Sequence, residues 1–330
     1  MAGRRSRTRA AGAPLLTMIA LIILAFQAPE AAQNQRGVDQ SLMYMRGQSV
    51  LPMYMGWVKQ ADGSFDLHFG YINRNWQEEL DIPAGPDNNV SAPFGPDAGQ
   101  PTHLLPGVNR WQFAVRVPPD FGTREVVWTV TANGDTNRAY GTLKNGYTQD
   151  ALGMQREFQA DPPNGNQWPT VRVEGETTRT ARVGQPFTLT ALVADDGLPK
   201  PAPSPTRRER GFLPGLETVG MVGSQTNVRS AIGLRFAWYL HRTAAEGTAP
   251  RGIDSRKWVT FDPPQFETWE DFRTGRDSPW APGWITPPVP PDGRYVTQVT
   301  FHQPGTFVLR GLTHDGFAWA SELVTVTVTP

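Results

Sequence analysis

The chain has 330 residues, a formal charge of zero, 33 glycines, 31 prolines and no cysteine. A chain of this length has room for about two domains, and its glycine and proline content favours short strands joined by turns over long helices. Four arginines lie within the N-terminal leader, so the rest of the chain is mildly acidic. That charge argues against a nucleic-acid partner.

Residues 1–32 have the order of a secretory signal peptide. Arginines up to Arg9 precede an apolar run over 15–26, and small residues such as Ala28 and Ala31 follow it. The run is shorter than the roughly 20 residues that a spanning helix needs, but no clean cleavage motif is present, so an uncleaved N-terminal anchor is the alternative. Because a chain without cysteine cannot be lipidated as a lipoprotein, we expect an exported bacterial protein, periplasmic or extracellular. It would touch the membrane only if this segment stays uncleaved.

Residues 50–144 are predicted to form a first β-sandwich, after an extended linker at 33–49. Two stretches alternate with a period of two residues, which puts their apolar side chains on one face of a strand. These side chains are Phe65, Leu67, Phe69 and Tyr71 in the first stretch and Trp111, Phe113, Val115 and Val117 in the second. His68 alternates with the first set and is expected to face solvent. Asn133-Gly134 predicts a tight hairpin turn, and 83–107 is expected to be a long loop.

A polar stretch at 145–169 is predicted to link this region to a second domain at 170–330. Several stretches of that domain alternate apolar with polar residues, as half-buried strands do. They cover 187–193, 234–240 and 295–301. In the second of these stretches, Trp238 lies on the apolar face.

Four segments of the second domain read VGQPFTLTALVADDG, LRFAWYL, PGTFVLRGLTHDG and ELVTVTVTP. They resemble the B, C, F and G strands of bacterial immunoglobulin-like domains, polycystic-kidney-disease repeats among them. The resemblance implies that Trp238 is the buried tryptophan of strand C and that Phe307 takes the place of the tyrosine-corner residue. It also implies that Leu189 and Leu309 fall near the positions of the two disulfide cysteines of antibody-type domains.

The resemblance has two departures: the Trp-x-Phe-Gly-Asp-Gly signature of polycystic-kidney-disease repeats is absent, and insertions at 199–210 and 261–293 enlarge the domain. The first region is similar to uncharacterised exported bacterial proteins in which this pair of β-domains recurs, a family with no activity to transfer. The predicted fold class is all-β, with two β-sandwich domains, the C-terminal one immunoglobulin-like with two long insertions.

No short motif of a hydrolase, phosphate-binding loop or dinucleotide-binding fold is present. Carboxylate clusters at 78–81 and 267–271 leave a hydrolase open, since a glycosidase needs only two suitably spaced carboxyl groups. We predict a non-enzymatic binding or structural protein of the cell envelope that acts through protein interaction. The alternatives are a carbohydrate-binding module or accessory subunit of a secreted hydrolase, and a hydrolase with an unrecognised carboxylate site.

Asp195, Asp196 and Asp315 form the candidate metal site. In an immunoglobulin-like sandwich the B–C and F–G loops lie at the same end, and these two loops carry the three aspartates. Oxygen ligands on flexible loops suit Ca²⁺, whereas Asp-Gly pairs also make ordinary turns. The residues favour turns and leave Ca²⁺ as the alternative; no other cofactor is indicated.

Trp269, Trp280 and Trp284 form the candidate surface for a partner protein or a glycan. They lie in the proline-rich insertion at 261–293. Tryptophan is enriched at interaction hot spots, which suits a binding role. The commoner role for such side chains is to fold back and pack on the sandwich, and this interpretation is weighed above binding.

Overall fold

The computed structural model describes residues 46–75, 78–144, 165–198, 200, 234–244, 257–265, 289–315 and 318–330. Residues 44–330 form one compact unit, distinct from residues 1–43. The predicted signal peptide or anchor, most of both predicted linkers and most of the two insertions lie outside the described residues. The predicted domain boundaries therefore stay predictions, and the described residues fold into sixteen strands.

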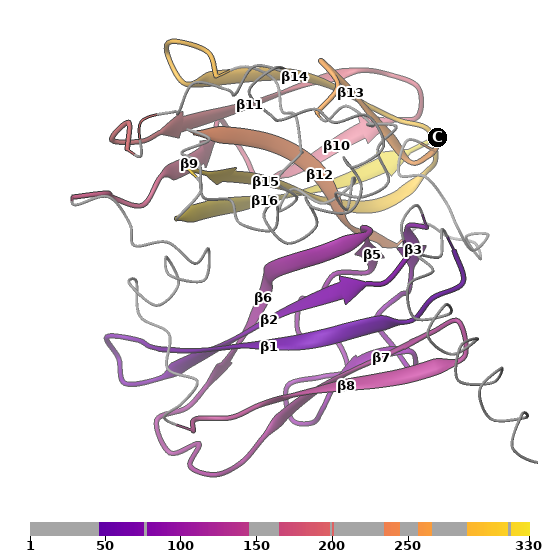
Figure 1. Ribbon diagram of the computed structural model, residues 1–330. Coiled ribbons are helices and arrows are strands. Elements are labelled where there is room, and N and C mark those ends of the chain that lie inside the picture. Colours follow the sequence, from indigo (N-terminus) through magenta and orange to yellow (C-terminus); the bar gives the residue numbers. More distant parts are fainter. Residues whose placement is uncertain are drawn as a thin grey trace, which may run out of the picture. The chain divides into compact units, whose positions relative to one another are not determined.

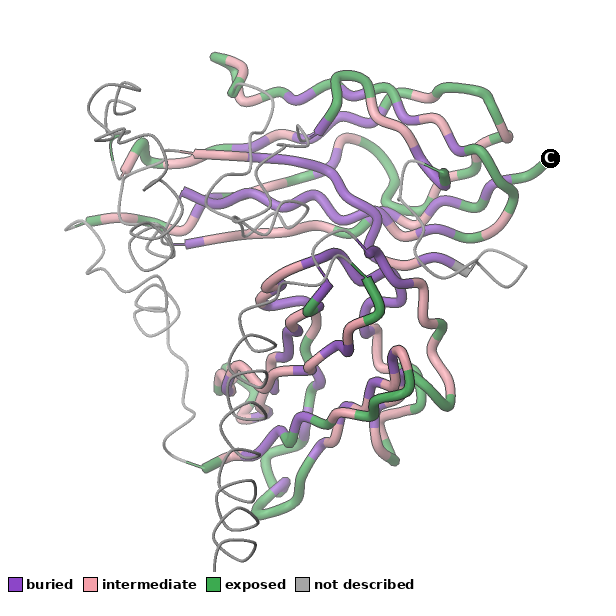
Figure 2. The backbone as a smooth tube through the Cα atoms, turned by 45° about the vertical axis from the view of Figure 1, so that its right-hand side comes forward, coloured by how far each residue is buried: buried purple, intermediate pink, exposed green. Residues whose placement is uncertain are grey.

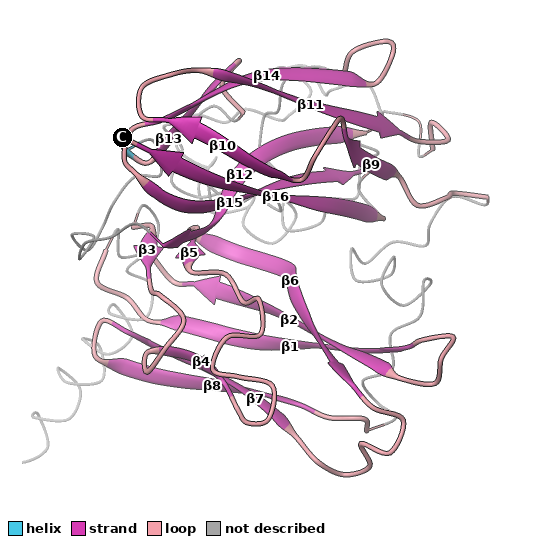
Figure 3. Ribbon diagram, turned by 180° about the vertical axis from the view of Figure 1, so that it is seen from behind, coloured by secondary structure: helices cyan, strands magenta, loops and turns pink. Residues whose placement is uncertain are grey.

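The first eight strands build a β-sandwich (Figures 1 and 3). One sheet has the order β1-β2-β6, the facing sheet has the order β4-β7-β8, and β3 and β5 form a separate pair. The strands are β1 (Val50–Lys59), β2 (Phe65–Asn73), β3 (Leu80–Asp81), β4 (Asn88–Val90), β5 (His103–Leu104), β6 (Gly107–Val117), β7 (Val126–Ala132) and β8 (Asp135–Gly141). The segment expected to be one long loop at 83–107 thus contains two short strands, which is a correction.

The core of this sandwich follows from strand alternation. Leu67, Phe69 and Tyr71 are buried on one face of β2, as predicted. Trp128 enters from β7, where its ring centroid lies 4.9 Å from that of Phe113, and its indole N–H donates to the Asn88 side chain. Figure 2 shows buried residues alternating along these strands, so the hydrophobic effect sets their register.

The β7–β8 turn and one side chain of β6 show what alternation can and cannot predict. Asn133 and Gly134 have φ of 53° and 90°, the left-handed pair that a two-residue hairpin requires, which confirms the predicted turn. Trp111, by contrast, does not join the core of the first sandwich. Opposite Gly70 the strand pairing is interrupted by a bulge, and Trp111 itself has a φ of 53°. A bulge re-aims a side chain, and Trp111 instead packs with Tyr239 of the second sandwich.

The remaining strands build the second sandwich, again from two sheets (Figure 1). One sheet has the order β10-β16-β15-β12 and the other has the order β13-β14-β11-β9. The strands are β9 (Thr170–Val173), β10 (Thr178–Arg182), β11 (Phe187–Ala194), β12 (Arg235–Ala244), β13 (Val259–Asp262), β14 (Arg294–Phe301), β15 (Gly305–His314) and β16 (Trp319–Thr329). In chain order β9, β11, β13 and β14 take the places of strands A, B, D and E, and β12, β15 and β16 those of C, F and G.

This strand order confirms an immunoglobulin-like sandwich. Strand β10 pairs in parallel with β16, while β15 pairs antiparallel with both β12 and β16. Trp238, Phe307, Leu189 and Leu309 are all fully buried in one core, as the resemblance implies. The two leucines fill space that a disulfide occupies in antibody domains, so this sandwich is stabilised by apolar packing.

Candidate functional site

The two sandwiches meet through a buried cluster that we call the junction. It contains the side chains of Leu105, Trp111, Tyr239 and Leu312, with Met55, Val58, Trp168 and Trp319 packed against them. The rings of Trp111 and Trp319 stack at a centroid distance of 6.1 Å and an interplanar angle of 21°. Aromatic stacking of this kind contributes beyond the area that it buries.

Arg310 places a positive charge in the junction. Its guanidinium donates to the backbone carbonyls of Trp111 and Gln112, at 2.7 and 3.2 Å, and lies over the ring of Trp319. The side chain comes from the outer face of β15, the strand whose inner face carries Leu309. A buried cation without partners is costly. The two carbonyls and the indole ring are such partners, which explains how the guanidinium of Arg310 can lie at only 3% exposure.

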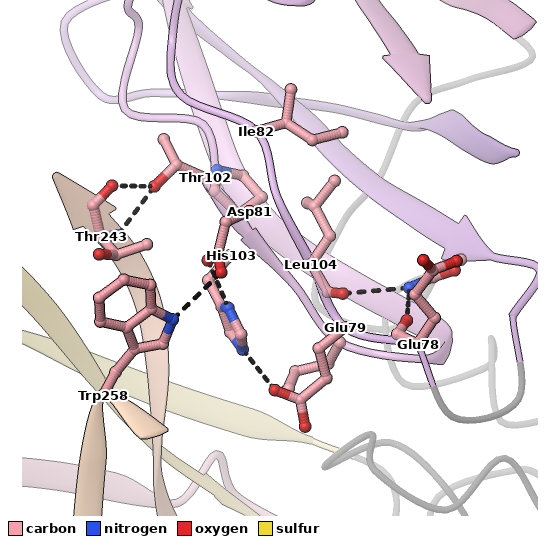
Figure 4. A network of polar contacts seen from close by, with 12 residues as sticks. Glu78, Glu79, Asp81, Ile82, Thr102, His103, Leu104, Thr243 and Trp258 are labelled. Atoms are coloured by element: carbon pink, nitrogen blue, oxygen red, sulfur yellow. Dashed lines mark hydrogen bonds and ion pairs between the residues drawn. The ribbon is translucent and has the colours of Figure 1, made fainter. Parts of the chain in front are cut away.

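Beside the junction, His103 lies between two carboxylates (Figure 4). Its Nε2 is 3.0 Å from Glu79 Oε2, and its Nδ1 is 2.8 Å from Asp81 Oδ1. The indole of Trp258, which belongs to the second sandwich, donates to the other oxygen of Asp81 at 3.1 Å. The cluster therefore links the β3–β5 pair to the residue that precedes β13.

The charge state of His103 follows from this enclosure. Burial opposes the charged imidazolium, but the charges and hydrogen bonds of Asp81 and Glu79 outweigh burial and raise the pKa of His103 to about 10. His103 is 1% exposed, so the group is an imidazolium enclosed by carboxylates at neutral pH. Loss of His103 would leave two buried carboxylates without their cation, and loss of either carboxylate would leave the imidazolium with one partner in place of two.

Thr102 joins the edge of β12 with three hydrogen bonds. Its backbone N–H donates to the carbonyl of His241 at 3.3 Å. Its hydroxyl donates to the carbonyl of Thr243 at 3.0 Å and accepts from the N–H of Thr243 at 2.8 Å. An edge strand offers unpaired backbone groups, and here the first sandwich satisfies part of that edge (Figure 4).

The sequence reasoning missed most of this site, and it misplaced His68. His68 does not face solvent: its ring lies 5.8 Å from that of Trp111 in an edge-on contact. Burial lowers the pKa of His68. The negative charge of Asp66 raises it in part, and the positive charge of Arg310 lowers it further. His68 is half-buried beneath Trp111, a contact that alternation within one strand does not reveal.

The carboxylate cluster at 78–81 is engaged within the fold. Glu78 accepts a hydrogen bond from the backbone N–H of Gly47 at 2.7 Å, while Glu79 and Asp81 contact His103. The run of acidic residues was therefore visible in the sequence. Its partner, His103, lies more than twenty residues further along the chain, so no local pattern connected the two. The second cluster, at 267–271, lies outside the described residues.

The three predicted metal ligands lie at one end of the second sandwich. Burial raises the pKa of Asp195, and the nearby charge of Asp315 contributes further, so these two loops do meet as predicted. The oxygens mostly accept hydrogen bonds that shape the loops: Asp196 accepts from the N–H groups of Gln167 and Leu198. Asp315 accepts from the N–H of Ala318 and the side chain of Asn166. Within the described part of the chain, no three His, Cys, Asp or Glu side chains are grouped to hold a metal ion.

Millimolar Ca²⁺ should shift the melting temperature of the purified protein by less than about 1 °C. Backbone N–H groups already donate to the carboxylates of Asp195, Asp196 and Asp315, and an ion that does not bind the folded state does not stabilise it. Thermal melting with Ca²⁺ and with EDTA measures this. A rise of several degrees that Asp315→Asn abolishes would instead establish the Ca²⁺ site.

Trp269, Trp280 and Trp284 lie outside the described residues, so their binding role stays a prediction. No helix among the described residues is long and apolar enough to span a membrane.

No family model matches the chain, and no curated protein matches it. Among solved structures it is similar to domains 4 and 5 of the S-layer protein SbsC, with 10% identity over 86% of this chain and 98% of that chain and a TM-score of 0.22. It is similar to the N-terminal eight Ig domains of Down Syndrome Cell Adhesion Molecule, with 9% identity over 85% of this chain and 27% of that chain and a TM-score of 0.21. The Yersinia pseudotuberculosis adhesin InvE has 10% identity over 86% of this chain and 60% of that chain, with a TM-score of 0.22. At these TM-scores the likenesses carry no argument, and the immunoglobulin assignment rests on the strand order.

Proposed function

We propose that this protein is an exported, non-enzymatic binding or structural protein of the bacterial cell envelope that acts through protein interaction. The observation that carries the proposal is the position of two buried charged side chains at the contact between the sandwiches. Arg310 and His103 are both less than 4% exposed, and both connect one sandwich to the other. Two buried charged groups of the described fold thus lie where the two β-sandwiches meet, as suits a rigid display or spacer protein.

The insertion at 261–293 is proposed to carry the binding surface, with Trp269, Trp280 and Trp284 as its contacts. Its prolines reduce the entropy that a loop loses on binding, and tryptophan side chains offer large contact areas at low entropic cost. The strands that flank the insertion, β13 and β14, pair directly with each other. The sandwich thus supplies a fixed base for whatever the insertion contacts.

Replacing Trp280 and Trp284 together with alanine should abolish cross-linking of the protein to its envelope partner in intact cells, while the melting temperature changes little. The expected loss is large because buried aromatic anchors each contribute about 2 kcal/mol or more at an interface. Tyr140→Ala is the matched control, since Tyr140 is a 51% exposed aromatic residue on β8, far along the chain from the insertion. This control should leave cross-linking unchanged.

Three outcomes decide against this proposal. A double variant that melts much earlier yet cross-links normally shows that the insertion packs on the sandwich and that the contact site is elsewhere. Binding of the wild type to a glycan array, lost in the double variant, identifies a carbohydrate-binding module. Release of reducing sugar from polysaccharide mixtures identifies a hydrolase.

Osmotic-shock fractionation, with the mass of the exported chain, tests export and cleavage after the leader.

A further inference from the structure

A second buried histidine, His241, lies against Tyr239 of the junction, and nothing in the proposed function uses it. His241 lies on the outer face of β12 and is 1% exposed. Neither ring nitrogen has a hydrogen-bond partner of ordinary geometry within the described chain, although the backbone of Gly99 lies close enough to oppose the lowering of the His241 pKa. The edge of the Tyr239 ring faces it at a centroid distance of 6.4 Å. A buried imidazole in this setting is neutral, because only its neutral form escapes the cost of burying a charge.

Three positively charged side chains lie around His241, and each comes from a different strand. Arg310 on β15 is one, Arg242 on β12 is the next, and the enclosed His103 on β5 is the third. The acids in this region are already paired: Glu79 and Asp81 contact His103, and Asp97 contacts Arg242. Protonation of His241 would therefore add a fourth positive charge without a carboxylate free to balance it.

We propose that the junction is an acid-sensitive contact, in which protonation of His241 loosens the packing of the two sandwiches against each other. Separation of the outer faces of β12 and β6 admits water, and water stabilises the imidazolium that the closed junction rejects. The closed contact would then be favoured at neutral pH and weakened when an exported protein meets an acidic medium. The proposal goes beyond the proposed function and does not depend on which partner is bound.

The direction of the effect follows from proton linkage. Burial, followed by Arg310 and Arg242, lowers the pKa of His241 well below its ordinary value of 6.5. A basic group whose pKa is lowered in the closed form contributes nothing above pH 6.5 and destabilises that form as the pH falls below 6.5. For one such group the closed-to-open ratio should fall between pH 7 and pH 5, by about 25-fold at most, the limit for a histidine that stays neutral in the closed form. His68 on β2 acts in the same direction, but Asp66 opposes its shift.

The absence of cysteine from the chain makes the opening measurable. A single thiol introduced as Leu312→Cys is buried at the junction, and Leu189→Cys is buried inside the second sandwich. The rate of reaction with 4,4′-dithiodipyridine, divided by the rate for the same thiol in the urea-unfolded chain, reports how often each site opens. Leu105→Cys, which lies at the junction on the first sandwich, is a second reporter if Leu312→Cys does not fold.

Between pH 7 and pH 5 the normalised rate at the junction thiol should rise, by about 25-fold at most, while the thiol inside the second sandwich changes much less. His241→Leu in the same background should remove most of the rise, because leucine cannot take up a proton. His302→Asn is the control, since His302 is exposed, and it should leave the rise intact. The proposal is overturned if the junction thiol shows no rise, if both thiols rise together, or if His241→Leu responds to acid as the wild type does.

Discussion

Trp238→Ala should lower the free energy of unfolding by about 3 to 5 kcal/mol, the range measured when large aromatic side chains are truncated in cores. Trp238 is fully buried between the two sheets of the second sandwich. Its ring meets Phe236 edge-on at a centroid distance of 5.4 Å. The indole also lies against the backbone of β15: a Cβ at Gly311 would come within 2.9 Å of it. Gly311 has no side chain of its own to fill the space that alanine would leave on this side of the ring.

Urea denaturation of the wild type and of Trp238→Ala measures this loss. Tyr140→Ala removes an aromatic side chain from an exposed position on β8 and should change the free energy of unfolding by less than about 0.5 kcal/mol, as surface substitutions usually do. A loss of under about 1 kcal/mol for Trp238→Ala would contradict its placement in the core.

The success of the sequence at Trp238 and its failure at Trp111 have one physical cause. Alternation reports which residues share a face of a regular strand, and β12 is regular through Trp238. In β6 the pairing with β2 is interrupted beside Trp111, where Gly70 allows Asn109 to approach so that a Cβ would lie 2.6 Å from its carbonyl oxygen. A single glycine therefore decides which sandwich Trp111 packs against, and no local pattern signals it.

The junction was beyond sequence reasoning for a different reason. An outward-facing arginine or histidine on a β-strand has the same pattern whether water or a second sheet covers it. His68 was assigned to solvent on this ground, and nothing in the strand pattern marked Arg310 or His241 as buried. Only the pairing of the two sandwiches, set by contacts more than a hundred residues apart, distinguishes these side chains from surface ones.

Asp81→Asn should lower the free energy of unfolding by about 1.5 to 3 kcal/mol at pH 7, because it removes a charge-assisted hydrogen bond to His103 and leaves Glu79 as the one carboxylate paired with the imidazolium. The Asp81 side chain is 6% exposed and contacts both His103 and Trp258. Asparagine has nearly the same shape, so the substitution removes the charge and leaves no cavity. Asp120→Asn is the control: the Asp120 side chain is 85% exposed in its pair with Arg124, and its replacement should have no measurable effect.

The loss should also depend on pH, which distinguishes charge pairing from packing. The pKa of His103 is raised to about 10, so its stabilising effect is fully present below the unfolded value near 6.5 and disappears as the pH rises through about 10. The difference between wild type and Asp81→Asn should therefore be largest near pH 6 and shrink by pH 10, because His103 is then losing its proton in the wild type as well. Urea denaturation at pH 6, 8 and 10 measures this difference. If it stays constant across that range, the contribution of Asp81 comes from the shape of its side chain and its hydrogen bond to Trp258, and the imidazolium of His103 plays no part.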